Sequence, residues 1–353
     1  RDRAKAVQAK GKVIVAAALA IFASRVQFAE HKIPVPAFFS FIVIDGDTAA
    51  KVLYFHRVIR VKGNVDFVAV AVTRFIYWLK HTIGKEPITE LSASKKLESL
   101  RAEGEHYLEQ SFDPILAYGA HGAIVHYEPT EETDIPMEPR GLCLADTGAQ
   151  YLEGTTDITR MTAVGRIDDD MKRDVTLVLK AHIALARAVV PAGVSGSQLD
   201  AIARAPLWAK GLDFGHGTGH GVGCRLNVHE GPFHISPRAT KTGELGLQAG
   251  ILVSDEPGLY RPGHRGVRIE NLIVARRAAS TEFGEFLAFD VATLCPIDLR
   301  TVDVSLLTPD EVAWLDDYHG KVLTALQNEA LSTRAQAWLK ARTAPAFRSR
   351  NIV

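Results

Sequence analysis

Apolar residues recur at every third or fourth position over five stretches of the chain, and this spacing predicts helices. The five stretches are residues 64–83, 88–103, 168–190, 198–210 and 308–326. The third is expected to stop at Pro191, because proline lacks the backbone N–H that continues a helix. The last one is amphipathic.

Shorter apolar runs bounded by turn residues predict strands between these helices. Residues 38–44 and 51–55 flank the turn signal Asp45-Gly46-Asp47 and predict a hairpin. Residues 141–146 and 150–160 predict two strands joined by a tight turn at Thr147-Gly148. We also expect strand and loop over residues 111–130, strands over 251–254 and 267–274, and a tail over the last dozen residues.

Length and composition are those of a globular protein with one large domain or two. The chain has 353 residues, of which 47% are hydrophobic and 23% are charged. Lys+Arg and Asp+Glu both total 41, so the formal net charge is zero. A neutral chain has no global electrostatic reason to bind nucleic acid or an anionic membrane, so we expect neither partner, although a local basic patch stays open.

Cysteine usage and the N-terminal segment bear on the compartment. Three cysteines are a poor disulfide framework and fit a reducing compartment, so we expect a cytoplasmic protein. Residues 13–23 form an apolar run behind several basic residues, which resembles a signal peptide. The run equally fits a buried strand that leads into a helix, and it is too short to span a bilayer. Because the chain begins with Arg1, we expect its native start to be missing.

Two aspartates near the predicted turn at Thr147-Gly148 are the first candidates for chemistry. Asp146 ends one predicted strand and Asp157 lies in the next, so an antiparallel pairing can place them side by side. Two adjacent carboxylates repel each other unless a cation lies between them. The alternative is that Asp146 only begins a turn and Asp157 only makes a local hydrogen bond.

A glycine-rich segment supplies the second candidate. His216 and His220 alternate with glycines over residues 215–223, where the backbone can pass close to a ligand. The segment lacks the Lys-Ser/Thr of a P-loop and does not fit G-x-G-x-x-G. His229-Glu230 is followed by Gly231-Pro232, which cannot continue a helix, so the zinc motif H-E-x-x-H is excluded.

Two glutamates complete the set. Glu256 follows an apolar run and precedes the turn Pro257-Gly258, and alternation puts Arg268 and Glu270 on one face of a predicted strand. Alone, each of these residues fits a surface salt bridge or a turn. Together with the two aspartates and His220, they supply four carboxylates and an imidazole. Such a set suits Mn²⁺, Co²⁺, Fe²⁺ or Zn²⁺ in a two-metal site.

Several motifs resemble those of the pita-bread metallopeptidases, in particular the longer soluble form of the Xaa-Pro aminopeptidases. They are GAIVHY (122–127), DTGAQYLEGTTDITR (146–160), GHGTGHGVG (215–223), NVHEGP (227–232), EPGLY (256–260), GVRIEN (266–271) and the closing segment 294–319. The resemblance implies an α+β fold with a pita-bread catalytic domain over residues 61–330. A partial creatinase-like α/β domain would precede it over residues 1–60, with most of the family's N-terminal region lacking, and a C-terminal extension would follow over 331–353.

The resemblance also implies roles for individual residues. The ligands of two divalent metal ions would be Asp146, Asp157, His220, Glu256 and Glu270. Mn²⁺ is the first choice for these ions, with Zn²⁺ or Co²⁺ as alternatives. Glu256 would also shuttle the proton. His126 and His229 would contact the substrate or stabilise the tetrahedral intermediate, His216 would line the pocket near the proline side, and Arg268 would steady Glu270.

The implied activity is removal of an N-terminal residue when proline is the second residue, by a metalloaminopeptidase that forms a homodimer. Prolidase, which cleaves Xaa-Pro dipeptides, is the nearest alternative. A pita-bread module that binds peptides without cleaving them is another, as is creatinase-like chemistry on a small amidino compound. Retention of all five ligand positions argues against these last two.

Overall fold

A computed structural model describes two units of the chain, residues 1–58 and 59–353. The described residues are 41–43, 51–53, 67–225, 227–238, 246–327, 329 and 331–346. In the first unit, strands β1 (Phe41–Val43) and β2 (Lys51–Leu53) pair antiparallel, which confirms the core of the predicted hairpin. The apolar run at residues 13–23 lies outside the described residues.

The described helices of the second unit follow the five predicted stretches, except for the last one, which was not predicted. They are α2 (Phe67–Thr82), α3 (Glu90–Ala102), α4 (Asp169–Ala186), α5 (Gly196–Trp208), α6 (Pro309–Leu326) and α7 (Thr333–Arg342). The side chains of Thr89, Asp168, Ser195, Thr308 and Ser332 cap their N-termini. The predicted end of α4 was wrong. The helix stops at Ala186, and Val190–Pro191 forms strand β9, which pairs with β16 (Gly284–Val291).

The sheet beside the two aspartates contains Asp146 and begins its last strand directly after Asp157, and the connection between their strands differs from the prediction. Strands β4 (Ile115–Tyr118), β5 (Leu142–Thr147) and β8 (Ile158–Ala163) form an antiparallel sheet in the order β4-β5-β8. The tight turn at Thr147-Gly148 was wrong, because the chain first enters a second sheet of β3 (Tyr107–Gln110), β6 (Ala149–Tyr151) and β7 (Gly154–Thr155). A Cβ at Gly148 would lie 2.0 Å from the carbonyl oxygen of Thr156, so only glycine fits this crossing.

The two glutamates lie just beyond the ends of two strands in another sheet, Glu256 after β12 (Leu252–Asp255) and Glu270 before β15 (Asn271–Thr281). The strand order of this sheet is β12-β15-β16-β9. Two short pairs flank it, namely β10 (Gly219–His220) with β11 (His234–Ile235) and β13 (Gly258–Arg261) with β14 (Arg265–Arg268). The strand predicted over residues 267–274 is therefore broken, because Ile269 and Glu270 lie between β14 and β15.

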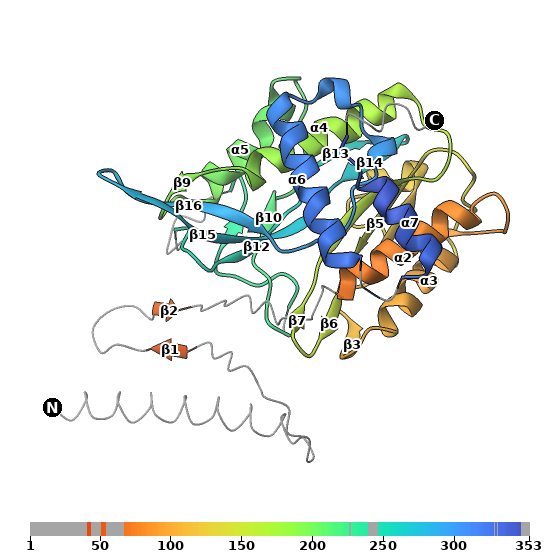
Figure 1. The fold of residues 1–353 in the computed structure, drawn as a ribbon, viewed down its shortest axis with the longest axis horizontal. Helices are drawn as coiled ribbons and strands as arrows, with labels where there is room; N and C mark the ends of the chain where they lie inside the picture. The colour runs from red at the N-terminus through yellow and green to blue at the C-terminus, as the bar shows by residue number, and fades with distance from the viewer. Residues whose placement is uncertain are drawn as a thin grey trace, which may run out of the picture. The chain divides into compact units, whose positions relative to one another are not determined.

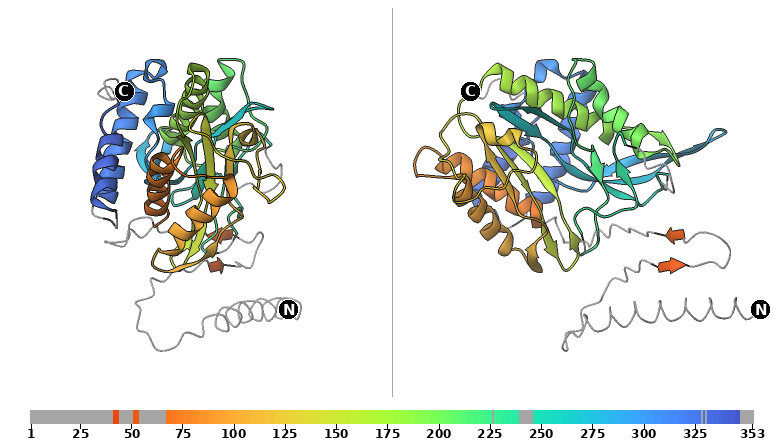
Figure 2. Two further views of the ribbon diagram at one scale, coloured as in Figure 1. Left: turned by 90° about the vertical axis from the view of Figure 1, so that its right-hand side faces the viewer. Right: turned by 180° about the vertical axis from the view of Figure 1, so that it is seen from behind.

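Two of the three buried apolar clusters among the described residues hold these layers together. The larger one joins α2, α3, α6 and the β4-β5-β8 sheet, and the other joins α5 to β12, β15 and β16. Figures 1 and 2 show α4 and α5 side by side in green, with α6 in blue. Helix α7 packs on α2, where the rings of Trp338 and Tyr77 lie 5.7 Å apart. Ala346 is fully buried, so the predicted tail was wrong as far as residue 346.

The described part of the second unit also contains short 3₁₀ helices. The 3₁₀ helices are η1 (Gly119–Ala123), η2 (Leu299–Thr301) and η3 (Val304–Leu306).

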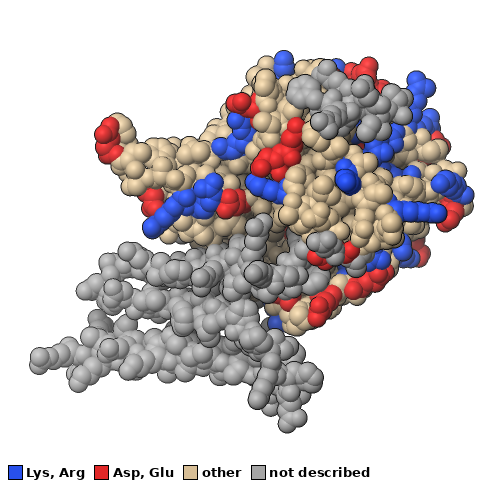
Figure 3. All heavy atoms as spheres, viewed as in Figure 1, with Lys and Arg blue, Asp and Glu red and all other residues tan. Residues whose placement is uncertain are grey.

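On the face drawn in Figure 3, basic and acidic side chains are interspersed. The structure describes all three cysteines, and no disulfide joins them. Within the described ranges, none of the helices is both long and apolar enough to cross a membrane.

Candidate metal centre

Strand register places the two aspartates on one face of the β4-β5-β8 sheet. Asp146 on β5 is the direct partner of Thr159 on β8. Asp157 precedes Thr159 by two positions, and residues two apart point to the same face of an extended chain. The aspartates therefore face one side, as predicted, although the connection between their strands differs from the predicted turn.

Register also brings the two glutamates together. Asp255 and Asn271 are direct partners at the end of the antiparallel pair β12–β15. Glu256 follows Asp255, and Glu270 precedes Asn271, so the glutamates stand opposite each other one step beyond the ladder. The backbone N–H of Glu256 donates to the Thr218 carbonyl at 2.8 Å, which keeps that step ordered.

Glycines on both sides of His220 allow β10 to approach these strands. A Cβ at Gly219 would lie 1.9 Å from the carbonyl oxygen of Ser254, and one at Gly221 would lie 2.2 Å from that of Glu230. The backbone N–H of His220 donates to the Ser254 hydroxyl at 2.9 Å. These two glycines thus allow close approach to neighbouring backbone, whereas the predicted approach to a ligand stays a prediction.

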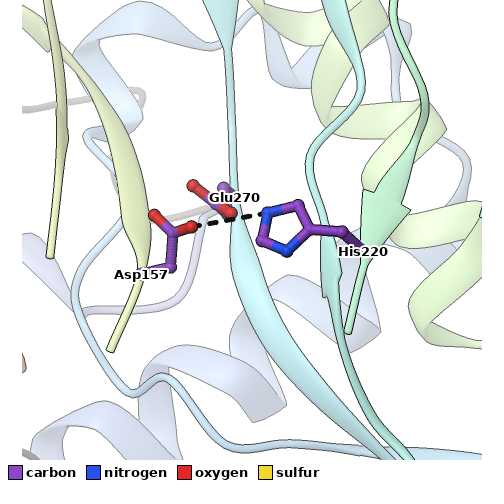
Figure 4. A group of neighbouring side chains, drawn as sticks. All are labelled: Asp157, His220 and Glu270. Atoms are coloured by element: carbon purple, nitrogen blue, oxygen red, sulfur yellow. Dashed lines mark ion pairs between the residues drawn. The ribbon is translucent and has the colours of Figure 1, made fainter. Parts of the chain in front are cut away.

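The five predicted ligand residues converge on one place. Nε2 of His220 lies 3.5 Å from Oδ2 of Asp157 and 3.3 Å from Oε1 of Glu256. One ligand atom each from Asp157, His220 and Glu270 lies within 4.8 Å of the others. Figure 4 shows these three side chains pointing toward one another from separate segments. Asp146 belongs to the same group, because its charge raises the pKa of Asp157.

Carboxylate oxygens in this group lack donors. Within the part of the chain that the structure describes, Oδ1 of Asp146, Oδ1 of Asp157 and Oε1 of Glu270 are buried without a hydrogen-bond partner. Burial, followed by the neighbouring carboxylates, raises the pKa of Asp157 and of Glu270 well above the usual range. A buried, unpaired carboxylate is costly, and a bound cation removes that cost. The donor set therefore fits divalent metal ions.

Other side chains orient the carboxylates. Arg268 donates to Oδ2 of Asp146 from Nη2 at 2.6 Å. The hydroxyl of Thr159 donates to Oε2 of Glu270 at 2.8 Å, and that of Ser254 donates to Oε1 of Glu256 at 3.1 Å. Sequence analysis missed the two hydroxyl residues, although each lies two positions from a predicted ligand.

A hydrogen-bond relay leads from Arg268 to His216. Nη1 of Arg268 donates to the hydroxyl of Tyr260 at 2.7 Å, and this hydroxyl lies 2.8 Å from Nε2 of His216. Nδ1 of His216 lies 2.7 Å from the Gly217 carbonyl, so Nδ1 carries the hydrogen and Nε2 accepts. Burial lowers the pKa of His216 to about 4, so its ring is neutral at pH 7. Sequence analysis did not single out Tyr260.

The other two predicted histidines lie nearby. The ring of His229 lies 4.1 Å from that of His220. Partial desolvation, followed by His220 and His126, lowers the pKa of His229 to about 4. His126 is exposed on the turn after η1 and interacts electrostatically with His216 and His229. His229 therefore lies beside the ligand His220, and His126 lies near His216 and His229.

Comparisons with known proteins agree with this geometry. Residues 61–277 match metallopeptidase family M24, and residues 285–346 match the C-terminal region of peptidase M24. The chain is 42% identical over 283 residues to a probable Xaa-Pro aminopeptidase P of Tuber melanosporum, covering 78% of this chain and 45% of that protein. It is 44% identical over 261 residues to aminopeptidase P1 of Lotus japonicus, covering 73% and 39%. The chain thus spans less than half the length of these relatives.

Solved structures give the same result for the fold. The X-prolyl aminopeptidase of Caenorhabditis elegans, described as a cytosolic enzyme with a di-nuclear active site, has a TM-score of 0.74 at 39% identity and covers 79% of this chain and 46% of that one. A Xaa-Pro dipeptidase of Bacillus anthracis has a TM-score of 0.55 at 30% identity, covering 66% and 59%. The expected α+β pita-bread fold is confirmed, and the chain belongs to metallopeptidase family M24.

Proposed function

We propose that this chain carries the catalytic site of a metal-dependent Xaa-Pro aminopeptidase, which hydrolyses the peptide bond before a penultimate proline. The observation that carries the proposal is the convergence of four carboxylates and His220 around buried oxygens that lack donors among the described residues. Relatives named Xaa-Pro aminopeptidase P support this specificity. The catalytic domain would span residues 61–330, after a partial creatinase-like domain over 1–60 and before an extension over 331–353.

The metal ligands in this proposal are Asp146, Asp157, His220, Glu256 and Glu270. Two divalent ions bound there would activate a water molecule and polarise the scissile carbonyl. Mn²⁺ is our first choice, with Zn²⁺ or Co²⁺ as alternatives, because hard oxygen donors predominate. Arg268 would hold Asp146 in its ligating orientation through the bond to Oδ2, as Thr159 would hold Glu270.

Glu256 would move the proton. Burial raises the pKa of its carboxyl above the usual range, which favours proton uptake from the attacking water. Its Oε1 is held by the Ser254 hydroxyl at 3.1 Å. The proline nitrogen is tertiary in the peptide and must gain a proton to leave, so Glu256 would deliver the same proton to it.

Three histidines would contact the substrate. His229 and His126 would donate hydrogen bonds to the carbonyl oxygen as it gains negative charge. His216 would line the proline side of the pocket, where its relay to Tyr260 fixes the ring orientation. A neutral, oriented ring presents a largely apolar face, which suits the pyrrolidine ring.

Hydrolysis of Arg-Pro-Pro by metal-stripped protein tests this function. We expect release of free arginine only after Mn²⁺, Zn²⁺ or Co²⁺ is added, and no release from Asp157→Asn. Cleavage of Arg-Pro without cleavage of Arg-Pro-Pro would indicate a prolidase instead, a possibility favoured by the likeness to the B. anthracis dipeptidase. Peptide binding without hydrolysis under any metal would indicate a non-catalytic module.

Assembly and compartment are further parts of the proposal. A cytoplasmic location is supported by the likeness to an enzyme described as cytosolic and by the three free cysteines. A homodimer is the assembly that the family resemblance implies. Light scattering coupled to gel filtration distinguishes a dimer from a monomer of 38.5 kDa. A monomer over the micromolar range would contradict the dimer and leave the metal chemistry intact.

A further inference from the structure

A buried histidine lies behind the two glutamate ligands, on the side away from the other ligands. Because side chains alternate along a strand, Asp255 and Asn271 point opposite to Glu256 and Glu270. They point to α4, where His182 is fully buried. Nδ1 of His182 lies 3.1 Å from both the carbonyl oxygen and Oδ2 of Asp255, and Nε2 lies 3.0 Å from Nδ2 of Asn271. One imidazole therefore joins both members of the last cross-strand pair.

The direction of each hydrogen bond is determined by Arg160. Nη2 of Arg160 donates to Oδ1 of Asn271 at 2.7 Å, and a guanidinium can only donate. The amide nitrogen of Asn271 must then face His182 and donate to Nε2. The hydrogen of His182 consequently lies on Nδ1 and points to Asp255. We call Arg160, Asn271, His182 and Asp255 the buried hydrogen-bond chain.

The buried hydrogen-bond chain also contacts the backbone of the ligand residue Glu270 and helix α6. Nη1 of Arg160 donates to the carbonyl oxygen of Glu270 at 2.6 Å. From α6, the hydroxyl of Tyr318 lies 2.8 Å from Nη2 of Arg160, and the ring of Trp314 meets that of His182 edge-on at 5.9 Å. Contacts with Glu270 and with α6 therefore enclose the buried hydrogen-bond chain and limit its freedom to rearrange.

We propose that His182 is a positioning residue for the metal centre, which fixes the separation of Glu256 and Glu270 by bonding to the residue beside each of them. The inference rests on the proposed metal-dependent function. Without the imidazole, the last residue pair of β12 and β15 loses its hydrogen bonds to α4. The carbonyl of Asp255 and the amide of Asn271 then lose a hydrogen-bond partner while they stay buried. The two carboxylates can then move apart, and displaced ligands bind metal more weakly. Loss of such a partner typically costs 10- to 100-fold in metal affinity.

If His182 has only a structural role, the expected result of its removal is different. In that case its removal lowers the stability of the fold and leaves the metal affinity of the folded molecules unchanged. Thr176 offers a matched control, because it is a fully buried polar residue on the same helix. Its hydroxyl bonds to Lys172 O at 2.7 Å and accepts from Asp303 N–H at 2.8 Å, away from both glutamates.

The experiment is Mn²⁺ titration calorimetry on the full chain, with His182→Leu, His182→Gln and Thr176→Val beside the unaltered protein. We expect a Kd for Mn²⁺ about 10-fold or more higher in His182→Leu, a smaller rise in His182→Gln, and a change below about 2-fold in Thr176→Val. Glutamine can accept from Asn271 at the position of Nε2, so it should restore part of the affinity. The visible spectrum of bound Co²⁺ should change in His182→Leu and not in Thr176→Val.

Two results would overturn the inference, and they have different meanings. Equal Mn²⁺ affinity and an equal Co²⁺ spectrum in the His182 variants and the unaltered protein would remove the positioning role alone. If His182→Leu does not fold, His182→Asn takes its place, because its shorter side chain cannot reach both Asp255 and Asn271, and unchanged affinity in that variant has the same meaning. An unaltered protein that binds none of Mn²⁺, Zn²⁺ and Co²⁺ would remove the metal centre, and the positioning role with it.

Discussion

Arg268 donates two hydrogen bonds to the same oxygen of Asp146, from Nη2 at 2.6 Å and from Nε at 3.1 Å. Its third nitrogen, Nη1, donates to Tyr260 at 2.7 Å. The arginine thus occupies Oδ2 of Asp146 and leaves Oδ1 without a partner among the described residues. The arrangement suits a metal ligand, because Oδ2 fixes the orientation of the carboxylate and Oδ1 stays available to a metal ion.

Substitution Arg268→Lys should therefore impair the metal centre. A lysine has a single nitrogen and cannot reproduce the planar fork that holds Asp146 through two nitrogens and Tyr260 through a third. We expect kcat/KM for Arg-Pro-Pro to fall about 10- to 100-fold and the Kd for Mn²⁺ to rise. Arg265→Lys on the same strand is the control, because Arg265 bonds to Asp174 at 2.8 Å outside the site. Equal losses in the two variants would contradict the specific role of Arg268.

Substitution Asp157→Asn should have opposite effects on stability with and without metal. In metal-free protein the Asp157 carboxylate is buried beside other carboxylates, so removing its charge should raise Tm by about 2–4 °C at pH 8. With Mn²⁺ the variant should be the less stable protein, because it lacks a ligand that binds only in the folded state. Differential scanning calorimetry with and without a chelator measures both effects.

The pH dependence of this effect has a definite sign. The folded-state pKa of Asp157 is raised well above its ordinary value of 3.8, so metal-free protein loses stability from about pH 3.8 upward, and the loss is complete above the raised pKa. The Tm advantage of Asp157→Asn should therefore shrink as pH falls from the raised pKa toward 3.8. Asp174→Asn is the contrast, because Asp174 pairs with Arg261 and Arg265, and it should destabilise the fold with or without metal. A metal-free Asp157→Asn less stable than the unaltered protein at pH 8 would contradict the charge argument.

Some parts of this site can be predicted from sequence and others cannot, as particular residues show. The ligands stand in local settings that sequence records, such as Glu256 before Pro257-Gly258 and His220 between glycines. The approach of Glu256 to Glu270 depends on the β12–β15 register, which no local pattern specifies. The antiparallel pairing of the strands next to Asp146 and Asp157 was predicted correctly, although the predicted connection between them was wrong.

Errors in the fold have the same origin. The break at Ile269-Glu270 was missed because both residues are compatible with a strand, and tertiary pairing with β12 decides where β15 begins. The proline at position 191 lies five residues beyond the end of α4, in a strand whose partner β16 is distant in sequence. His182 was missed as a functional candidate because a histidine within a helical apolar pattern carries no local signal of its partners.

Glu90 should affect catalysis without affecting the metals. Its buried carboxylate accepts from Tyr118 N–H at 2.6 Å and from the Tyr127 hydroxyl at 2.7 Å, and it pairs with His121 at 2.9 Å. These bonds hold the turn that carries His126. Glu90→Gln removes the charge and one strong acceptor, so we expect kcat to fall about 10-fold through misplacement of His126.

Steady-state kinetics and Mn²⁺ calorimetry on the same preparation test the Glu90 prediction. The Kd for Mn²⁺ should stay within about 2-fold of the unaltered protein, because Glu90 has no contact with the five ligands in the described part of the chain. Addition of His126→Ala to Glu90→Gln should cause little further loss, since both act on one group. Full additivity of the two losses would contradict a shared cause.

His319 on α6 should set much of the acid sensitivity of the fold. Its ring is fully buried, Nε2 accepts from Ile297 N–H at 3.1 Å, and burial followed by Arg160 lowers the pKa to about 3. The unfolded chain takes up this proton below about pH 6.5 while the folded chain does not, so the free energy of unfolding falls as pH drops from about 6.5 to about 3. Between pH 7 and pH 5 this one group should cost about 2 kcal/mol. In His319→Gln, whose amide oxygen can replace Nε2 as acceptor, urea unfolding should show a correspondingly smaller loss, whereas His264→Gln at an exposed turn should behave as the unaltered protein does. An unchanged loss in His319→Gln would assign the acid sensitivity to other groups.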